Sequence, residues 1–289
     1  MADIDRRRAK LEAQVQTLYL KFLEEFEGSA EFDEVETLLF RGEIDRAIAA
    51  IEDAMDRAFS ELDELIQGSA KDESRALGLL LGAALFFSIT SDDLRNLIIN
   101  NRASVLQRIK AGQRAAIDAM LIDAYTSGRS PGTAVRDAFG LTSVLATALS
   151  NYRGVLDRQN RQAAEEGRER MTDTQIARMT DAYRKRLQQI RSRQISRRTA
   201  TRVVSESQDL ALRQAVEQGA LEENRVVRVW NRIPDDRVRD AHDVMQGQKA
   251  GLNETFTDGS GNTLRFPGDP HAPLETTINC RCTLTLQLK

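Results

Sequence analysis

Apolar side chains recur at steps of three and four residues along most of the chain, which is the period of an amphipathic α-helix. The rhythm extends over residues 4–27 and again over residues 43–66. The stretch between them, 28–41, is acidic and lacks the rhythm. The pattern therefore predicts two helices, acidic and solvated on their outer faces, with a broken segment between them.

The middle of the chain continues in helical periods. We expect helices over residues 74–88, 92–111 and 113–126, a further helix that starts after Thr142, and a long one over 172–219. The apolar stripe of the long helix is narrow, which indicates that this helix packs against neighbours on one side only.

Helix boundaries in this region carry recognisable signals. Ser91 precedes two carboxylates, as an N-cap residue does. Gly128 ends one helix and Ser130-Pro131 begins the next, because proline is tolerated in a first turn but not in the middle of a helix. Gly219 fits the end of the long helix.

The period changes after residue 221. Residues 226–233 are mostly β-branched or aromatic, which favours a strand, and 235–245 return to a helical pattern. Residues 256–266 hold a turn-rich centre between two apolar arms and predict a hairpin, while 282–288 alternate as a half-buried strand does. These elements predict a small α+β domain.

The predicted fold class is therefore mainly α: an elongated helical N-terminal and middle region, followed by a small C-terminal α+β domain that a metal ion can clamp. A chain of 289 residues fits two or three domains. We assign residues 1–70 to acidic N-terminal helices, 71–221 to a helical body that includes a basic segment, 184–202, and 222–289 to the C-terminal domain.

Charge is distributed unevenly along the chain. The net charge of −3 argues against a protein that binds nucleic acid or membranes over its whole surface. Residues 1–75 hold twenty acidic and ten basic side chains, whereas 184–202 hold eight basic and no acidic ones. The eight are Arg184, Lys185, Arg186, Arg191, Arg193, Arg197, Arg198 and Arg202.

Two interpretations of this basic segment stay open. It can contact phosphates through charge alone, in a sequence-independent and salt-sensitive way, because Tyr183 is the only nearby aromatic for base stacking. Alternatively, it is a solvated helix face, or a face that docks on an acidic partner or on the acidic N-terminal helices of another copy.

The side chains best suited to bind a soft metal are confined to the last quarter of the chain. Both histidines and both cysteines of the protein lie there: His242, His271, Cys280 and Cys282. A structural zinc site takes four ligands from thiolates and imidazoles, and a domain of about 60 residues gains stability from such a clamp. Cys280 and Cys282, two residues apart at the start of a strand, share one face and can point at one ion. We therefore predict a zinc site formed by these four residues.

Two other interpretations of these residues stay open. His242 can pair with a carboxylate such as Asp236 while the cysteines fill the core as small apolar side chains. Cys280 can also act as a nucleophile beside His242. No second catalytic signature accompanies the pair, so we expect no enzymatic activity.

Asp235, Asp236 and Arg239 fall within about one helical turn. We interpret them as a structural salt bridge that orients the predicted helix against the strand of Trp230. Acid–base chemistry by the two carboxylates would need a pocket that the pattern does not supply.

Further features bear on the location of the protein. A disulfide across one intervening residue would be strained, which favours a reducing compartment. The first residues lack the apolar core of a signal peptide. The longest apolar run, 76–89, is shorter than the roughly 20 residues that span a bilayer, so we interpret it as a buried core helix, with membrane contact as the alternative.

Several residues of the last quarter occur in a characteristic order: Trp230, Asp235, Asp236, Arg239, His242, Gly247, an aromatic-Pro-Gly-Asp turn at 266–269, and Asn279-Cys280-Arg281-Cys282. This order resembles the signature of the phage Mu F-like minor head proteins, also called head morphogenesis proteins. Residues 195–219 and 128–156 resemble the helical segments that precede this domain in the family. The resemblance begins near residue 124, and it includes His242, Cys280 and Cys282 but not His271.

The resemblance implies a structural role in a virus particle. The chain is then a minor head protein of a tailed phage, inside the capsid or near the portal, which acts in head morphogenesis and in genome packaging or ejection. Expected partners are the portal, capsid or scaffold protein and packaged double-stranded DNA, with membrane contact restricted to ejection. We expect several copies per virion, in the head interior, and a passage through the host cytoplasm during assembly. The rival hypotheses are an enzyme or toxin-like effector that uses the Cys/His cluster, and a non-specific DNA-binding module.

Overall fold

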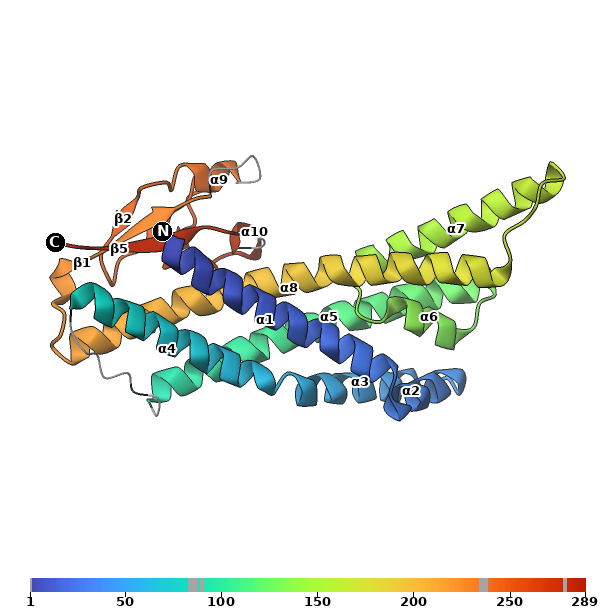
Figure 1. Ribbon diagram of the computed structural model, residues 1–289, viewed down its shortest axis with the longest axis horizontal. Coiled ribbons are helices and arrows are strands. Elements are labelled where there is room, and N and C mark those ends of the chain that lie inside the picture. The colour runs from blue at the N-terminus through green and yellow to red at the C-terminus, as the bar shows by residue number, and fades with distance from the viewer. Residues whose placement is uncertain (1, 83–87, 89–90, 234–238, 278–279) are drawn as a thin grey trace. The chain divides into compact units, whose positions relative to one another are not determined.

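The chain is mainly helical and ends in a small region that holds its described β-strands (Figure 1). The computed structural model describes residues 2–82, 88, 91–233, 239–277 and 280–289. Long helices followed by a small C-terminal α+β region confirm the predicted fold class.

The described helices before this region follow the apolar periods of the sequence. In chain order they are α1 (Ala2–Glu27), α2 (Ala30–Phe40), α3 (Ile44–Ala58), α4 (Glu61–Leu81), α5 (Asp92–Ser127), α6 (Pro131–Ala138), α7 (Ser143–Glu165) and α8 (Asp173–Glu217). Three predicted helix starts are confirmed. The hydroxyls of Ser91, Ser130 and Thr142 accept hydrogen bonds from the backbone N–H three residues on, at 3.2, 3.2 and 3.4 Å. Each satisfies a first-turn N–H that has no partner within the helix.

The chain divides into two compact units. Unit 1 comprises Met1–Thr17, Ser60–Ser104 and Gln194–Lys289, and unit 2 comprises Leu18–Phe59 and Val105–Arg193. Helices α1, α5 and α8 contribute residues to both units.

The prediction of a broken segment over 28–41 is wrong, because residues 30–40 form α2. The Ser29 side chain caps this helix, and Phe32 and Val35 are fully buried. The acidic residues that obscured the pattern lie on the outer side of a short helix that tertiary packing stabilises.

The single helix predicted over 43–66 is also wrong, since the structure divides it into α3 and α4. The division falls at Phe59, whose ring packs edge-on against Tyr19 and Phe22, with centroids 6.3 and 6.1 Å apart. The turn thus directs a large aromatic side chain into the interior of unit 2.

Conversely, α5 is one helix where the sequence predicted two. Gly112 does not end it. A Cβ at this position would lie 2.8 Å from Nη2 of Arg191, so the glycine leaves room for that side chain. Glycine costs about 1 kcal/mol in a helix interior, so α5 continues through Gly112 despite this residue's low helix propensity.

The apolar run 76–89 is described only in part, because residues 83–87 and 89 lie outside the described residues. Its first part belongs to α4, which ends at Gly82 in the left-handed conformation. No helix among the described residues combines the length and the apolar content that a bilayer crossing requires.

The interior of unit 2 is an aromatic cluster. Neighbouring rings lie 5.3–6.1 Å apart between centroids, at angles that are mostly tilted or edge-on. The cluster consists of Phe22, Phe26, Phe32, Phe59 and Phe139. Such pairs add about 0.5–1.5 kcal/mol each to the burial of their apolar area.

The C-terminal region contains two small antiparallel sheets. Its elements are η1 (Glu223–Arg225), β1 (Val226–Asn231), α9 (Asp240–Asp243), β2 (Lys249–Ala250), β3 (Phe256–Thr257), β4 (Thr263–Leu264), α10 (Leu274–Thr277) and β5 (Thr283–Leu288). The first sheet has the order β2-β1-β5, and β3 pairs with β4 as a hairpin. The predicted first and last strands and the hairpin are confirmed, while β2 was not predicted. Of the helix predicted over 235–245, the structure describes only α9 as helical.

Candidate metal centre

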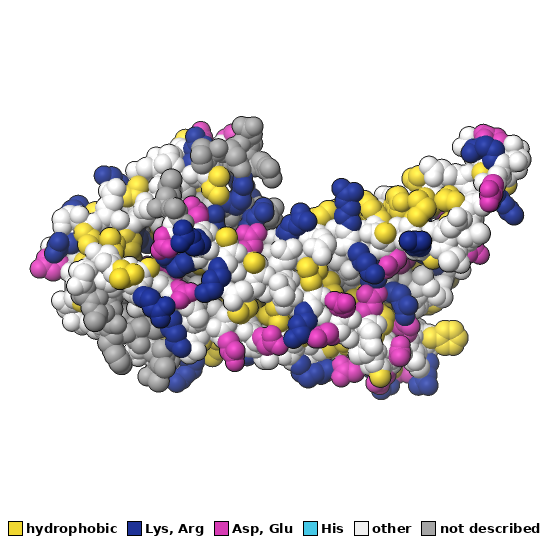
Figure 2. All heavy atoms as spheres, in the orientation of Figure 1, with side chains coloured by type: hydrophobic (Ala, Val, Ile, Leu, Met, Phe, Trp, Pro, Cys, Tyr) yellow, Lys and Arg dark blue, Asp and Glu magenta, His cyan; other side chains and the backbone are white. Residues whose placement is uncertain are grey.

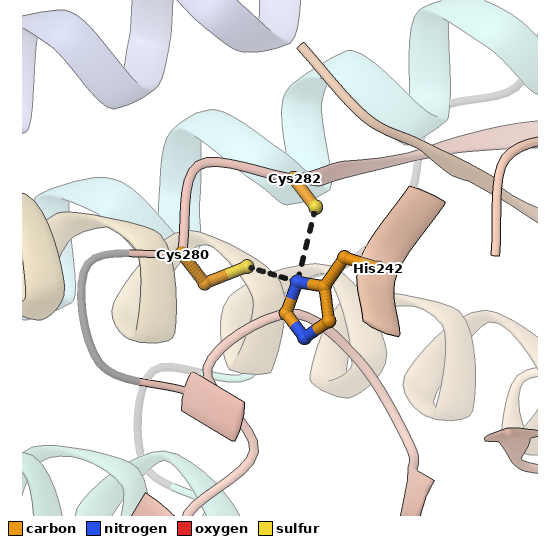
Figure 3. A group of neighbouring side chains, drawn as sticks. All are labelled: His242, Cys280 and Cys282. Atoms are coloured by element: carbon orange, nitrogen blue, oxygen red, sulfur yellow. Dashed lines mark hydrogen bonds between the residues drawn. The ribbon is translucent and has the colours of Figure 1, made fainter. Parts of the chain in front are cut away.

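The candidate site lies where β5 begins and where α9 faces it. Register places Trp230 of β1 opposite Leu284, two residues after Cys282, so both cysteines come to the end of the sheet next to the Trp230 ring. His242 projects from α9 towards the same point, and Figure 3 shows its imidazole directed between the two sulfur atoms. The Trp230 and His242 rings pack edge-on with centroids 6.0 Å apart.

The geometry of these three side chains fits one metal ion. The Nδ1 atom of His242 lies 3.6 Å from Sγ of Cys280 and 3.7 Å from Sγ of Cys282. All three ligand atoms lie within 4.8 Å of one another. A tetrahedral zinc ion, about 2.3 Å from sulfur and 2.0–2.1 Å from nitrogen, places those two atoms about 3.5 Å apart. The two Nδ1 to Sγ distances therefore match those around such an ion.

The site is enclosed in the apolar core of the C-terminal region. His242, Cys280 and Cys282 are 2, 4 and 3% exposed. The residues around them are Trp230, Met245, Phe256, Leu264, Phe266 and Leu284. Burial excludes water and makes charge balance in the site important, because unpaired charges are costly in a low dielectric.

Burial and mutual contact shift the pKa values of the two thiols in opposite directions. Sharing a hydrogen bond with Cys280 lowers the pKa of the Cys282 thiol to about 5, with a further contribution from His242. The same hydrogen bond, together with burial, raises the pKa of the Cys280 thiol. Metal ligation requires thiolates, and the lowered pKa of Cys282 favours one of them.

The other imidazole nitrogen of His242, Nε2, is buried and has no hydrogen-bond partner among the described residues. When Nδ1 binds a metal, Nε2 carries the proton, and ligating histidines usually direct this N–H at a carboxylate or carbonyl. The Asp258 carboxylate is close enough to interact electrostatically with the ring.

Two helices hold the backbone of the cysteine loop. Arg8 of α1 donates a hydrogen bond to the carbonyl oxygen of Arg281, the residue between the cysteines. The Thr201 hydroxyl of α8 donates to the Cys280 carbonyl oxygen at 3.3 Å. The spacing of the two thiols is therefore fixed by groups outside the metal-binding set, which pre-organises the site.

The turn at 266–269 also rests directly on α8. A Cβ at Gly268 would lie 3.2 Å from the Arg202 Cα, and Gly268 has a φ of +80°. Only glycine satisfies both conditions without strain. This close approach is the physical basis for the glycine of the aromatic-Pro-Gly-Asp motif.

The prediction that His271 is a ligand is wrong. His271 is exposed and does not belong to the group formed by the other three. Its backbone N–H donates to the Asp269 carboxylate at 3.0 Å, as part of a turn that leaves the imidazole in solvent. No other His, Cys, Asp or Glu of the described residues joins this group of three.

Of the residues predicted to have structural roles, the structure describes Trp230 and Arg239 but not Asp236. Trp230 is completely buried in the core of the region. Arg239 precedes α9, donates to the Thr276 carbonyl oxygen at 3.5 Å, and lies near enough to Cys280 to favour its thiolate. Asp235 and Asp236 lie outside the described residues, so the salt bridge between Asp236 and Arg239 stays a prediction.

Several charges of the basic segment are neutralised within the chain. Arg184 is 4% exposed at its side chain and pairs with Glu27 and with Asp181, both at 2.7 Å. Lys185 also contacts Asp181, at 3.1 Å. Acidic groups of α1 and α8 therefore compensate the first part of the segment.

The second part of the segment is similar. Arg197 pairs with Glu12 at 3.5 Å, and Arg202 pairs with Glu206 at 3.1 Å. The other members are half-buried or exposed: Arg186, Arg191, Arg193 and Arg198. On the face shown in Figure 2, Lys and Arg side chains are interspersed with Asp and Glu. This weakens the DNA interpretation, because acidic groups of the same chain already neutralise several of these charges.

Sequence reasoning missed Arg228, which ties β1 to the loop before the hairpin. Its guanidinium is 2% exposed and donates to the carbonyl oxygens of Gly251, Glu254 and Arg265 at 2.7, 2.6 and 2.9 Å. It also lies over the Phe256 ring, 5.6 Å from the centroid. An arginine inside the run Val-Val-Arg-Val-Trp was the available signal, because a charge there must find buried partners.

Two aspartates of the predicted turns were missed as well. Asp258 Oδ1 accepts hydrogen bonds from the backbone N–H of Ser260 and Asn262 at 2.9 and 2.8 Å. Asp269 accepts from Arg265 at 2.8 Å. Burial alone would raise the pKa of Asp269, but these hydrogen bonds outweigh it and lower the pKa. The turn residues thus serve as polar supports for short strands.

Comparison of the chain with protein-family models, with curated proteins and with solved structures yields no match.

Proposed function

We propose that the C-terminal region is a protein-binding module held together by one zinc ion on His242, Cys280 and Cys282. We further propose that the chain is a minor head protein of a tailed phage, which acts in head morphogenesis and in genome packaging or ejection. The observation that carries the metal part is the pair of Nδ1 to Sγ distances, 3.6 and 3.7 Å, in a buried core.

The chemistry of the ligands supports zinc. Thiolates are soft ligands that favour zinc, copper(I) and iron–sulfur clusters over magnesium or calcium, and imidazole suits zinc well. Zinc has no redox chemistry and is usually tetrahedral, and His242, Cys280 and Cys282 would supply three of its four ligands. The three side chains would hold the ion, and its chemistry there would be to tie α9 to the start of β5.

A structural role fits the burial of the site better than catalysis does. A nucleophile must reach its substrate, whereas both cysteines are 4% exposed or less. In addition, β2, β3 and β4 have two residues each, and strands of this length need support from elsewhere. The proposed action is therefore binding through a stapled surface.

The phage assignment rests on the order of residues in the last quarter, which resembles the Mu F-like signature. Among those residues, His242, Cys280 and Cys282 converge in space. The proposed partners are the portal, capsid or scaffold protein, and several copies would lie in the head interior. Contact with packaged DNA is the weaker part of the proposal, because much of the basic segment is paired within the chain.

Metal content tests the first part. The full chain, purified under reducing conditions without added metal, is expected to hold one zinc ion per chain by mass spectrometry of the elements. His242→Ala and Cys282→Ser should each reduce zinc to a trace. His271→Ala is the matched control and should keep it, because this histidine is exposed and apart from the site. Full zinc in His242→Ala, or none in the wild-type chain, contradicts the proposal.

Co-purification tests the second part. The zinc-loaded chain, tagged and co-expressed with the portal protein encoded by the same genome, should be recovered in complex with it. Absence of a portal gene from that genome, or of a complex with any of its head proteins, would contradict the assembly role. The zinc proposal would survive that outcome, so the two parts fail separately.

A further inference from the structure

Helix α7 and the first part of α8, both in unit 2, lie side by side and run in opposite directions (Figure 1). The rings of Tyr152 on α7 and Tyr183 on α8 pack together, with centroids 4.5 Å apart. Both tyrosines are half-buried. The two helices thus meet through aromatic side chains that solvent still reaches.

Further apolar side chains continue this contact in both directions along the helices. Because the helices are antiparallel, one turn along from the tyrosines Val155 comes to the level of Met179, and two turns the other way Val144 comes to the level of Ile190. These four residues are 38, 40, 76 and 37% exposed. Figure 2 shows apolar side chains gathered along α7 and α8. We call this line the seam, and it consists of Val144, Ala148, Tyr152, Val155, Met179, Tyr183 and Ile190.

The seam faces away from the rest of unit 2. Ser150 of α7 donates a hydrogen bond to Asp123 at 2.8 Å, and Arg184 of α8 pairs with Glu27 at 2.7 Å. The helical period turns Ser150 by roughly 160° and Arg184 by roughly 100° from the tyrosines of the seam. One side of the helix pair is therefore attached to the body of the unit, and the seam lies on the free side.

The charges next to the seam are basic. Arg158 follows Val155 by three residues on α7, and Arg186 lies between Tyr183 and Ile190 on α8, so both border the seam. Both side chains are exposed, and neither has an ion-pair partner among the described residues. The seam thus has one positive charge available on each flank.

The acidic residues of these helices lie elsewhere. Asp181 pairs with Arg184 and Lys185. Asp157 lies two helical turns after Ser150, on the attached side, where it favours the charged form of Arg129. Glu165 and the residue after it come at the end of α7, beyond the seam. Among the described residues, the seam therefore combines apolar surface with basic flanks and lacks a carboxylate of its own.

We propose that the seam binds an amphipathic helix of another protein, which directs an apolar stripe at the seam and carries carboxylates on both flanks. Two packed antiparallel helices accept the side-chain ridge of a third, as in helical bundles. Such a helix contacts a groove through apolar anchors at steps of three and four residues. From Val144 to Val155 the seam extends about 17 Å, which matches about three turns of a partner helix. This inference goes beyond the function proposed above and does not depend on it.

Charge and shape select this partner over two others that an apolar surface can bind. The seam of a second copy would add its own Arg158 and Arg186 to the interface, and like charges oppose association. An anionic membrane would match the charge, but a helix that lies on a membrane presents one projecting apolar face. The seam instead lies between two helices, and its two tyrosines are half-buried. An acidic amphipathic helix fits both properties.

Three synthetic peptides of about 18 residues test the proposed partner chemistry. The first has leucines at helical spacing and glutamates on both flanks. The second has lysines in place of the glutamates, and the third has the composition of the first with the leucine positions scrambled. In fluorescence anisotropy with the full chain, the first should bind with a Kd of about 10–100 μM, at least about 10-fold more tightly than the other two.

Variants of exposed residues test whether the seam is the binding surface. Met179→Glu removes an apolar contact and adds a like charge, so it should weaken binding of the first peptide about 10-fold or more. Ile122→Glu is the matched control and should bind as the wild type does, because Ile122 is an exposed apolar residue of α5 outside the seam. The double variant Arg158→Glu with Arg186→Glu should prefer the lysine peptide to the glutamate peptide. Far-ultraviolet circular dichroism should match the wild type in all three.

Four results overturn the proposal. The first two are a wild-type chain that binds the three peptides alike, or none of them up to about 1 mM, and an affinity that Met179→Glu leaves unchanged. The third is a wild-type dimer in sedimentation velocity that Met179→Glu abolishes, because the seam would then bind a second copy. The fourth is seam-dependent binding to vesicles of phosphatidylcholine and phosphatidylglycerol without binding of the glutamate peptide. If Met179→Glu does not fold, the double arginine variant decides the question.

Discussion

Unit 2 and the C-terminal region achieve order in opposite ways. Unit 2 packs helices around five phenylalanine rings, whose neighbouring centroids lie 5.3–6.1 Å apart. The C-terminal region has short strands and a core in which Arg228, His242 and two cysteines are buried beside apolar residues. The stability of unit 2 depends on buried apolar area. That of the C-terminal region also depends on buried polar groups with specific partners.

The contrast explains which part of the molecule is sensitive to chemistry. Apolar burial is non-directional and tolerates gradual change, whereas a polar group that loses its partner in a core pays the full cost of its desolvation. We therefore expect the C-terminal region to respond sharply to the loss of single atoms. The predictions below test this difference, from the largest expected effect to the smallest. Trp230, the single tryptophan, reports on the C-terminal region, and far-ultraviolet circular dichroism reports on the helices.

Removal of the proposed zinc ion should have the largest effect. A strong chelator, or the double variant Cys280→Ser with Cys282→Ser, is expected to unfold the C-terminal region, because structural zinc supplies up to about 10–16 kcal/mol in small domains. The Trp230 emission should shift to longer wavelength while the helical signal at 222 nm is largely retained. An unchanged emission in both experiments would show that the region folds without a metal.

Phe59→Ala should have the next largest effect, in the other region. Loss of a fully buried ring between Tyr19 and Phe22 is expected to lower the free energy of unfolding by about 3–5 kcal/mol, as seen in urea titrations followed by circular dichroism. Zinc content and Trp230 emission of the folded variant should equal those of the wild type. A loss of zinc would mean that the two regions are less independent in their stabilisation than we infer.

Arg228→Met should have the third largest effect and lower the free energy of unfolding by about 3 kcal/mol. Methionine fills much of the same volume but leaves the carbonyl oxygens of Gly251, Glu254 and Arg265 without their donor. The loss should be seen in urea unfolding followed by Trp230 emission. The free energy of unfolding of Arg228→Lys should lie between those of the wild type and Arg228→Met, since one ammonium group cannot reach all three acceptors. A Met variant as stable as the wild type would argue against polar support of this region.

Asp269→Asn should have the smallest effect, about 1–2 kcal/mol at neutral pH. The amide keeps the shape of the carboxylate but loses its charge, which stabilises the hydrogen bonds from Arg265 and from the His271 backbone. Urea unfolding followed by Trp230 emission measures the difference. If Asp269→Asn lowered the free energy of unfolding more than Arg228→Met does, the number of buried partners would not determine the size of the effect.

Much of the fold could be predicted from the sequence because it is encoded locally. The apolar periods determined the helical class, and Ser91, Ser130 and Thr142 marked helix starts through their own side chains. The change of period after residue 221 determined the strands at each end of the C-terminal region and its hairpin. For the site, the spacing of Cys280 and Cys282 was sufficient to predict a common direction.

The remaining features depend on groups that are distant along the chain, so local patterns could not reveal them. Phe59 lies where one predicted helix divides in two, and its ring meets Tyr19 and Phe22, which precede it by 40 and 37 positions. The selection of His242 over His271 is of the same kind. Both histidines were chemically suitable, but only one lies on an element that faces the start of β5.

The sequence by itself thus determined which elements form and which residue types can bind a metal. The tertiary structure decided which of them meet: His242 with the cysteines, and Arg228 with three carbonyl oxygens. The physical reason is range. Helical and strand periods arise from contacts within a few residues, whereas the cluster of His242, Cys280 and Cys282 joins residues that are 38 and 40 positions apart.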